Sequence, residues 1–297
     1  MGLDCLKGLI TKDFPPEFVV IHKNFDIEKK FQEFFQPIEK ICSDYDIPLV
    51  KTEKIIEIKN NFSGLDFGIC VGFMEIIGKD ILEIPKLGIF NLHCGKLPHY
   101  RGRAPISRTI IDGNSELTMT LHKMDEGVDS GDILYEYDIP IKDNDDVNSL
   151  YKKCGELSSE VVLNGIEKII SQNSPIDIFI KQDLSLKPKS NKIISDEERK
   201  INWDNNIKSI HNLIRALTPP YPCAFGIYED RRFYFIKSEI FSIETCKARN
   251  LGEIYFVDED YLLINCKDGL LKIMEVHSED NKKVKFEEVF KPRGVFK

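Results

Sequence analysis

The sequence predicts an α/β fold with a Rossmann-like, mostly parallel sheet, followed by a small β-rich C-terminal domain. In the first half of the chain, apolar runs typical of buried strands alternate with stretches whose apolar residues recur at helical spacing. The last quarter instead holds short β-rich runs separated by turns that contain Asp and Gly. We therefore predict an N-terminal domain at 1–188, a linker and docking helix at 189–219, and a C-terminal β-barrel at 220–297.

The composition limits the classes of function. The 297 residues are 42% hydrophobic and 30% charged, which is ordinary for a globular protein. A formal net charge of -8 argues against a protein that neutralises phosphates broadly, so we expect no nucleic-acid partner. The eight cysteines form no CxxC pair, so neither a metal site nor a disulfide framework is predicted, and a reducing cytoplasm fits best. No apolar run approaches the ~20 residues of a membrane span, so no membrane contact is expected.

The N-terminal elements alternate between helix and strand. Leucines at helical spacing predict a helix at 2–9, and a β-rich run at 18–21 follows a Phe-Pro-Pro breaker. A helical period over 27–45 precedes a short strand at 47–50. Residues 66–73, DFGICVGF, form a continuous apolar run that is typical of a strand buried on both faces.

The most informative stretch is 87–102, LGIFNLHCGKLPHYRG. If its apolar part is a strand, alternation places the side chains of Asn91 and His93 on one face. The Gly- and Pro-containing segment that follows carries polar residues past the end of this strand, where open α/β sheets bind ligands. We therefore expect a reaction at this point.

The second informative stretch is 124–134, MDEGVDSGDIL, which follows a predicted helix at 105–111 and strand at 117–124. Its two glycines and four acidic residues predict a tight loop with Asp129 in the middle. An EF-hand that begins at Asp125 would need Gly at its sixth position, which is Ser130, so calcium binding is not predicted.

The C-terminal half begins with a long helix at 147–171. An amphipathic helix at 204–217 has Asp204 as its expected N-cap and is ended by a proline-rich segment. Four β-rich runs follow, at 233–240, 253–257, 261–266 and 270–275.

These stretches resemble the folate-dependent formyltransferases, in the branch whose catalytic domain is followed by a small OB-like barrel. The segments that carry the resemblance are DFGICVGFMEII, FNLHCGKLPHYRGRAPI, MDEGVDSGDIL and INWDNNIKSIHNLIRALTPPYPCAF. Within the branch, HYRGRAPI and HNLIRALTPPYP are most similar to enzymes that N-formylate nucleotide-linked amino sugars for cell-surface glycans such as O-antigen lipopolysaccharide. The resemblance implies N10-formyltetrahydrofolate as formyl donor and a nucleotide-linked amino sugar as acceptor.

The resemblance also implies that Asn91, His93 and Asp129 are the catalytic residues. A carboxamide can hydrogen-bond the formyl oxygen as negative charge develops in a tetrahedral intermediate. An imidazole can take a proton from the attacking amine and return one to the leaving nitrogen near neutral pH. A carboxylate can orient the imidazole, or a water beside it, and stabilise its charged form.

The folate and the sugar nucleotide have expected contacts too. By resemblance, the pterin lies against the backbone at Phe73, Met74, Ile76 and Ile77 and against the loop formed by Asp125, Glu126, Gly127 and Val128. The sugar nucleotide is expected over Tyr100, Arg101 and Arg103, where the two guanidinium groups would meet the diphosphate.

One departure from the family concerns the sheet. The family has a central strand before the helix that here begins at Gly2, and this chain has none. We expect either that the true start lies upstream of Met1, which we favour, or that the neighbouring strand edges are exposed or re-paired.

Two alternative functions remain. Methionyl-tRNA formyltransferase has the same layout, but its basic Gly- and Arg-rich insertion after the second strand is replaced here by HKNFDIEKKFQEFF. The C-terminal domain also has roughly balanced charge instead of a basic face. A formyltetrahydrofolate hydrolase, in which water replaces the amine, would use the same three catalytic residues. The exposed β-rich C-terminal domain is compatible with a homodimer.

Overall fold

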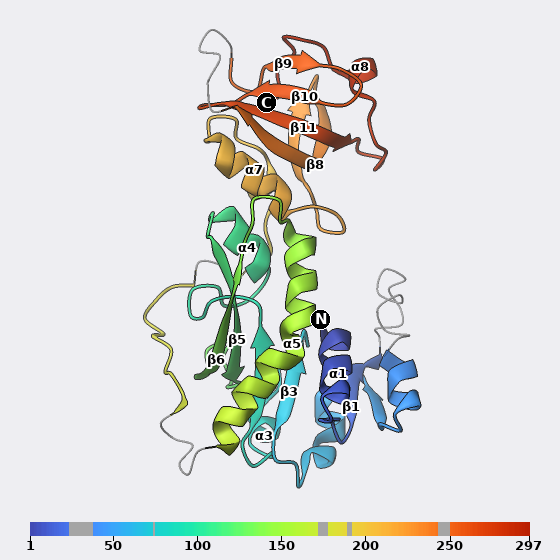
Figure 1. Ribbon diagram of the computed structural model, residues 1–297, viewed down its shortest axis with the longest axis vertical. Coiled ribbons are helices and arrows are strands. Elements are labelled where there is room, and N and C mark those ends of the chain that lie inside the picture. Colours follow the sequence, from blue (N-terminus) through green and yellow to red (C-terminus); the bar gives the residue numbers. More distant parts are fainter. Residues whose placement is uncertain (24–37, 74, 172–177, 189–191, 243–249) are drawn as a thin grey trace. The chain divides into compact units, whose positions relative to one another are not determined.

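The computed structural model describes residues 1–23, 38–73, 75–171, 178–188, 192–242 and 250–297 (Figure 1). The chain divides into two compact units that do not follow a single cut point along the sequence. The first unit comprises Met1–Gly102, Leu117–Ile139 and Tyr151–Asn191. The second comprises Arg103–Glu116, Pro140–Leu150 and Lys192–Lys297.

The first unit has the expected α/β character. Its helical elements are α1 (Gly2–Thr11), η2 (Ile55–Phe62), α3 (Lys79–Leu82) and most of α5 (Val147–Ile170). Its strands are β1 (Val19–His22), β2 (Leu49–Thr52), β3 (Gly68–Val71), β4 (Ile89–His93), β5 (Glu116–Lys123) and β6 (Ile133–Pro140). β1 and β2 pair in parallel, and a four-stranded sheet has the order β3-β4-β5-β6. In this sheet β4 is parallel to β3 and antiparallel to β5.

The two sheets of the first unit are separate. In the described part of the chain, β1 pairs only with β2, and β3 pairs only with β4. All four residues of β3 remain partly exposed, whereas four of the five residues of β4 are buried.

The packing of the first unit holds β4 rigidly in place. Ile89, Phe90 and Leu92 are buried on the two faces of this strand. Burial on both faces was expected of the run at 66–73, and that expectation is wrong because β3 is partly exposed along its whole length. The long helix α5 contributes Cys154 and Val161 to the core, at the spacing expected for one helix face. The strand that carries Asn91 and His93 is therefore fixed by apolar packing around it.

The second unit is built on an antiparallel sheet. Its helices are α4 (Pro105–Ile111), α6 (Asp196–Arg199), α7 (Ile207–Ala216) and α8 (Phe286–Val289), together with the beginning of α5. Its strands are β7 (Ala224–Tyr228), β8 (Arg231–Ser242), β9 (Ile254–Val257), β10 (Leu262–Asn265) and β11 (Leu270–His277). Their order is β7-β8-β11-β10-β9. The 12-residue strand β8 pairs with both β7 and β11. Figure 1 shows β8 running beside β11.

The C-terminal segment joins the two edges of this sheet. Lys297 exchanges two backbone hydrogen bonds with Ile227 of β7, at 2.7 and 3.0 Å. Gly294 accepts one at 2.8 Å from Ile254 of β9, and Phe296 donates one at 2.9 Å to Gly252. No ladder pairs β7 directly with β9 among the described strands, so it is this irregular segment that gives the sheet its barrel-like closure.

Two local expectations differ from the structure. The N-cap of α7 is Asn206, whose side chain accepts a hydrogen bond from the Ser209 amide at 2.8 Å, and not Asp204. Most of the helix expected at 27–45 lies outside the described residues, although 38–44 are helical. In the described part of the chain, no helix is both long and apolar enough to cross a bilayer.

The close approach of α1 to α5 generates a stability prediction. A Cβ atom at Gly8 would meet the Ser159 hydroxyl and lie 2.5 Å from the Ser159 Cβ, whereas one at Gly2 has no neighbour nearer than 3.4 Å. We expect Gly8→Ala to lower the free energy of unfolding by ~1–3 kcal/mol because the helices must separate. Gly2→Ala is the matched control and should be neutral or stabilising. Equal unfolding midpoints in urea for the two variants would contradict this packing.

Candidate active site

The antiparallel pairing of β4 with β5 positions two polar side chains of the site. Asn91 lies directly opposite His122, and His93 lies opposite Thr120. Because alternate residues share a face and directly opposite residues share a face, Asn91, His93 and His122 all project from one side of the sheet. The expectation that Asn91 and His93 share a face of one strand is confirmed.

The loop between β5 and β6 supplies the carboxylate. Asp129 has a positive φ of 49°, a left-handed backbone conformation that a non-Gly residue adopts at a cost. The Gln182 side-chain amide donates to the Asp129 carbonyl at 2.9 Å and to the Gly131 carbonyl at 2.6 Å. Gly102 donates its backbone N–H to Asp129 Oδ2 at 2.8 Å. The loop is thus pinned at its backbone and at its carboxylate.

The three predicted catalytic side chains converge. Asn91 Nδ2 donates to Asp129 Oδ1 at 3.3 Å, and His93 Nδ1 lies 3.5 Å from Asp129 Oδ2. His93 is buried and Asp129 retains a side-chain exposure of 16%. Residues that are far apart in the sequence are therefore brought to one point, which remains open to solvent through the carboxylate.

His93 is oriented by a group that the sequence did not indicate. Its Nε2 lies 2.7 Å from the carbonyl oxygen of Tyr100, and since a carbonyl only accepts, Nε2 carries the proton. In the neutral ring, Nδ1 is then the unprotonated nitrogen, and it faces Asp129 at a distance too long for a strong hydrogen bond. The nitrogen able to take up a proton is therefore Nδ1.

The charge states follow from burial and neighbours. Burial lowers the pKa of His93 and outweighs the Asp129 carboxylate and the Tyr100 carbonyl, which raise it. Burial by itself raises the pKa of Asp129, but contact with His122, the nearby His93 and the Gly102 N–H lower it from 3.8 to about 2. At neutral pH the site thus holds an ionised carboxylate beside a neutral imidazole.

His122 is a member of the site that sequence analysis did not select. Its side chain is 2% exposed, and its Nε2 lies 3.2 Å from Asn91 Nδ2 and 3.4 Å from Asp129 Oδ1. The sequence showed only a polar residue in an alternating strand. The signal that identifies it is the strand register, which becomes visible only once β4 and β5 are paired.

The residues expected around the pterin differ in the exposure of their side chains. Phe73 and Ile77 pack in an apolar cluster with residues of η2 and α3, so their side chains are largely withdrawn. Ile76 and Val128 are instead exposed, at 78% and 61%. Met74 lies outside the described residues.

The rest of that loop is exposed and internally braced. Asp125, Glu126 and Gly127 are all exposed. Asp125 Oδ1 accepts from the Gly127 amide at 3.0 Å and from the Ser130 hydroxyl at 2.7 Å. The loop therefore keeps its shape through its own hydrogen bonds.

Two of the residues expected to meet the sugar nucleotide have other partners. The Tyr100 side chain is only 4% exposed, and the carbonyl oxygen of this residue lies 2.7 Å from His93 Nε2. The Arg101 guanidinium donates to the carbonyls of Pro98 and Leu186, at 3.2 and 2.8 Å. Arg103 is exposed and is the first residue of the second unit.

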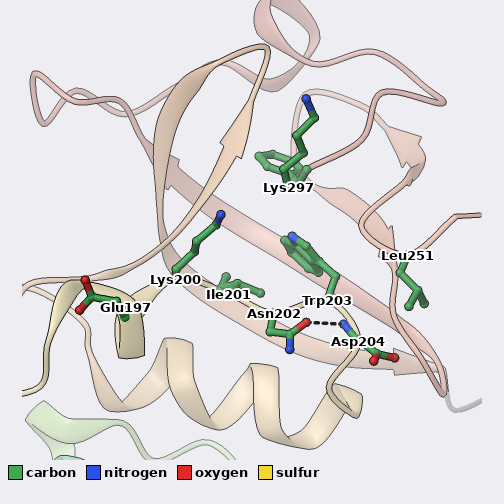
Figure 2. A pocket seen from close by; sticks show the side chains of 9 residues that line it. Glu197, Lys200, Ile201, Asn202, Trp203, Asp204, Leu251 and Lys297 are labelled. Carbon is green, nitrogen blue, oxygen red and sulfur yellow. Dashed lines mark hydrogen bonds between the residues drawn. The ribbon is translucent and has the colours of Figure 1, made fainter.

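A cavity of about 510 Å³ lies in the second unit, away from these residues in sequence. Trp203 is one of the residues that line it, and Figure 2 shows its indole between Lys200 and Leu251. The cavity contains none of the predicted catalytic or binding residues. Within the described residues, no group of three His, Cys, Asp or Glu side chains is arranged to hold a metal ion.

An α/β fold that brings a carboxamide, an imidazole and a carboxylate to the end of a strand is suited to acyl transfer. Residues 12–166 match the formyl transferase family, and residues 193–294 match the formyl transferase C-terminal domain. The chain belongs to the formyl transferase family and is a folate-dependent formyltransferase.

One relative supports this assignment, and two solved structures share the fold. A methionyl-tRNA formyltransferase of Caldicellulosiruptor saccharolyticus is 33% identical over 253 residues, which cover 84% of this chain and 79% of the relative. An N-formyltransferase of Helicobacter canadensis, solved with folinic acid and dTDP-3-aminofucose, has a TM-score of 0.60 at 22% identity and covers 92% of this chain and 94% of its own. HypX of Aquifex aeolicus, solved with tetrahydrofolic acid, has a TM-score of 0.61 at 16% identity over 91% of this chain but only 45% of its own.

The lowered pKa of Asp129 generates a pH prediction for stability. Because the pKa is about 2 in the folded protein against 3.8 for a free side chain, the ionised carboxylate stabilises the fold above about pH 4. This contribution, ~2 kcal/mol, is lost as the pH falls from about 4 to 2. In urea unfolding, the difference in the free energy of unfolding between the wild type and Asp129→Asn should therefore shrink across this pH range.

Asp80→Asn, which removes an exposed carboxylate, is the control. Its free energy of unfolding should stay within ~0.5 kcal/mol of the wild-type value at each pH. If the difference between the wild type and Asp129→Asn stays constant from pH 7 to pH 2, the carboxylate is not stabilised in its charged form.

Proposed function

We propose that the protein transfers a formyl group from N10-formyltetrahydrofolate to the amine of a nucleotide-linked amino sugar. The observation that carries the proposal is the convergence of Asn91 and His93 on the Asp129 carboxylate, within 3.5 Å. A donor for a developing negative charge, a neutral base and a fixed anion are the groups that acyl transfer to an amine requires.

Two exposed apolar side chains, in the segments expected to hold the pterin, fit a planar folate. Ile76 and Val128 leave apolar surface in water, and a pterin ring lying on them would cover it. The backbone groups of residues 125–128, on an exposed and internally braced loop, could then read the ring edge by hydrogen bonds. The formyl donor supplies the electrophilic carbonyl carbon.

His93 acts in this proposal through Nδ1. With Nε2–H held by the Tyr100 carbonyl, the ring can take a proton from the incoming amine only at Nδ1. The imidazolium then faces the ionised Asp129, so the charge is stabilised where it forms. Because Asp129 remains a carboxylate throughout, it stabilises the proton on His93 without taking it.

The fold and the charge of the chain favour an amino-sugar acceptor. The fold is shared with a sugar N-formyltransferase over 92% of this chain, with a TM-score of 0.60. The roughly balanced charge of the C-terminal domain and the net charge of -8 also favour a small acceptor over an RNA. The segment HKNFDIEKKFQEFF at 22–35, which stands in place of the insertion of the tRNA enzymes, lies mostly outside the described residues.

Methionyl-tRNA is the second candidate acceptor. The specific observation in its favour is the 33% identity to a methionyl-tRNA formyltransferase over 84% of this chain. A hydrolase, with water in place of the amine, would use the same side chains, and the amine acceptor is preferred because the matched family is one of formyl transferases.

An acceptor panel separates these functions. Purified protein is incubated with N10-formyltetrahydrofolate and uridine- or thymidine-linked amino sugars carrying the amine at position 3 or 4. Methionyl-tRNA and a reaction without acceptor are run in parallel. We expect a formylated amino sugar; formylation of methionyl-tRNA alone, or release of formate alone, would replace the proposed acceptor.

The role of His93 gives a kinetic prediction. His93→Ala should lower turnover by at least ~10² because the base is removed. In the wild type, burial lowers the pKa of His93, so the base stays neutral at lower pH and the acid limb of the pH–rate profile should lie below about 6.5. His277→Ala, which removes an imidazole on β11 of the second unit, is the control and should leave turnover unchanged. Near-wild-type turnover in His93→Ala would remove this residue from the mechanism.

A further inference from the structure

His122 is held in one tautomer by the backbone. Its Nδ1 lies 3.1 Å from the carbonyl oxygen of Lys123, so Nδ1 carries a proton and donates it there. In the neutral ring, Nε2 is then a lone-pair acceptor, and Asn91 Nδ2 donates to it at 3.2 Å. With the side chain fully buried, water does not compete for this contact.

The Asn91 carboxamide therefore faces two acceptors. One is His122 Nε2 and the other is Asp129 Oδ1, at 3.2 and 3.3 Å from Asn91 Nδ2. If the carboxamide were reversed, its oxygen would face the lone pair of His122 Nε2 and the carboxylate of Asp129. Both contacts would be repulsive. The NH₂ end of Asn91 is thus selected for this position.

The same distances leave one N–H of Asn91 available. Asn91 Nδ2, His122 Nε2 and Asp129 Oδ1 form a triangle with sides of 3.2, 3.3 and 3.4 Å. From Nδ2 the two acceptors therefore lie about 60° apart, whereas the two N–H bonds of a carboxamide diverge by about 120°. A single N–H directed between the two acceptors would lie about 30° from each of them, which would leave the second N–H unused.

We propose that His122 is a positioning residue that fixes the Asn91 carboxamide with one N–H free for the oxygen of the transferred formyl group. The inference rests on the proposed function, because only a reaction that develops charge on that oxygen uses the free N–H. His122 acts through Asn91 and does not touch the reacting atoms. It should therefore affect the rate of transfer more than the binding of the formyl donor.

Two substitutions test this role. His122→Phe keeps a planar ring but removes the acceptor, and His122→Gln offers a carbonyl oxygen close to where Nε2 lies. We expect His122→Phe to lower kcat by ~10–10² with the KM for N10-formyltetrahydrofolate changed less than ~3-fold. His122→Gln should recover most of the lost rate.

Thr118→Val is the matched control. Thr118 is buried on the same strand and face as His122, and its hydroxyl donates to Asp138 at 2.6 Å, away from Asn91. Its loss carries the cost of a buried hydrogen bond in β5 and should leave kcat unchanged. Equal kcat values for His122→Phe and the wild type, or equal losses for the Phe and Gln variants, would overturn the proposal.

A measurement on the wild type separates this inference from the proposed function. Nitrogen NMR of ¹⁵N-histidine-labelled protein reports which ring nitrogen of His122 is protonated, whether or not an acceptor has been found. We expect a protonated Nδ1 and a bare Nε2; protonation of Nε2 would overturn the positioning role. Absence of transfer to every acceptor, with the expected tautomer present, would instead count against the proposed function.

Discussion

The arrangement depends on one partly buried charge, the carboxylate of Asp129. It is held by the Gly102 amide at 2.8 Å and faces Asn91, His93 and His122 within 3.5 Å. Removing a carboxylate from water costs free energy unless its oxygens accept hydrogen bonds, and here each oxygen has a partner. Two features bring this charge to the end of β4: the positive φ of Asp129 and the hydrogen bond from the Gln182 side chain to its carbonyl.

The sheet supplies the other half of the constraint. Because β4 is buried and pairs on both sides, the side chains of Asn91 and His93 have little freedom to move. The loop with Asp129 is exposed, yet it is fixed by hydrogen bonds at residues 125, 129 and 131. A rigid strand and a braced loop together give the preorganised geometry on which charge stabilisation relies.

Much of this could be predicted from the sequence, since alternation in an apolar strand put Asn91 and His93 on one face and the Gly-rich acidic loop pointed to Asp129. The sequence could not identify His122, because its place in the site follows from the antiparallel register of β4 and β5. Nor could it indicate the Tyr100 carbonyl, since backbone groups leave no signature in side-chain patterns. The Tyr100 ring is buried, so this residue shows only its carbonyl to the site, and its contact with the sugar nucleotide stays a prediction.

The central claim is that Asn91, His93 and Asp129 surround the carbon that is transferred. The most direct measurement is a crystal structure of the protein with a stable formyl-folate analogue and a nucleotide-linked amino sugar. The account predicts the formyl oxygen within hydrogen-bonding distance of Asn91 Nδ2, with the acceptor amine beside His93 Nδ1. Binding of the formyl group away from these three side chains would contradict it.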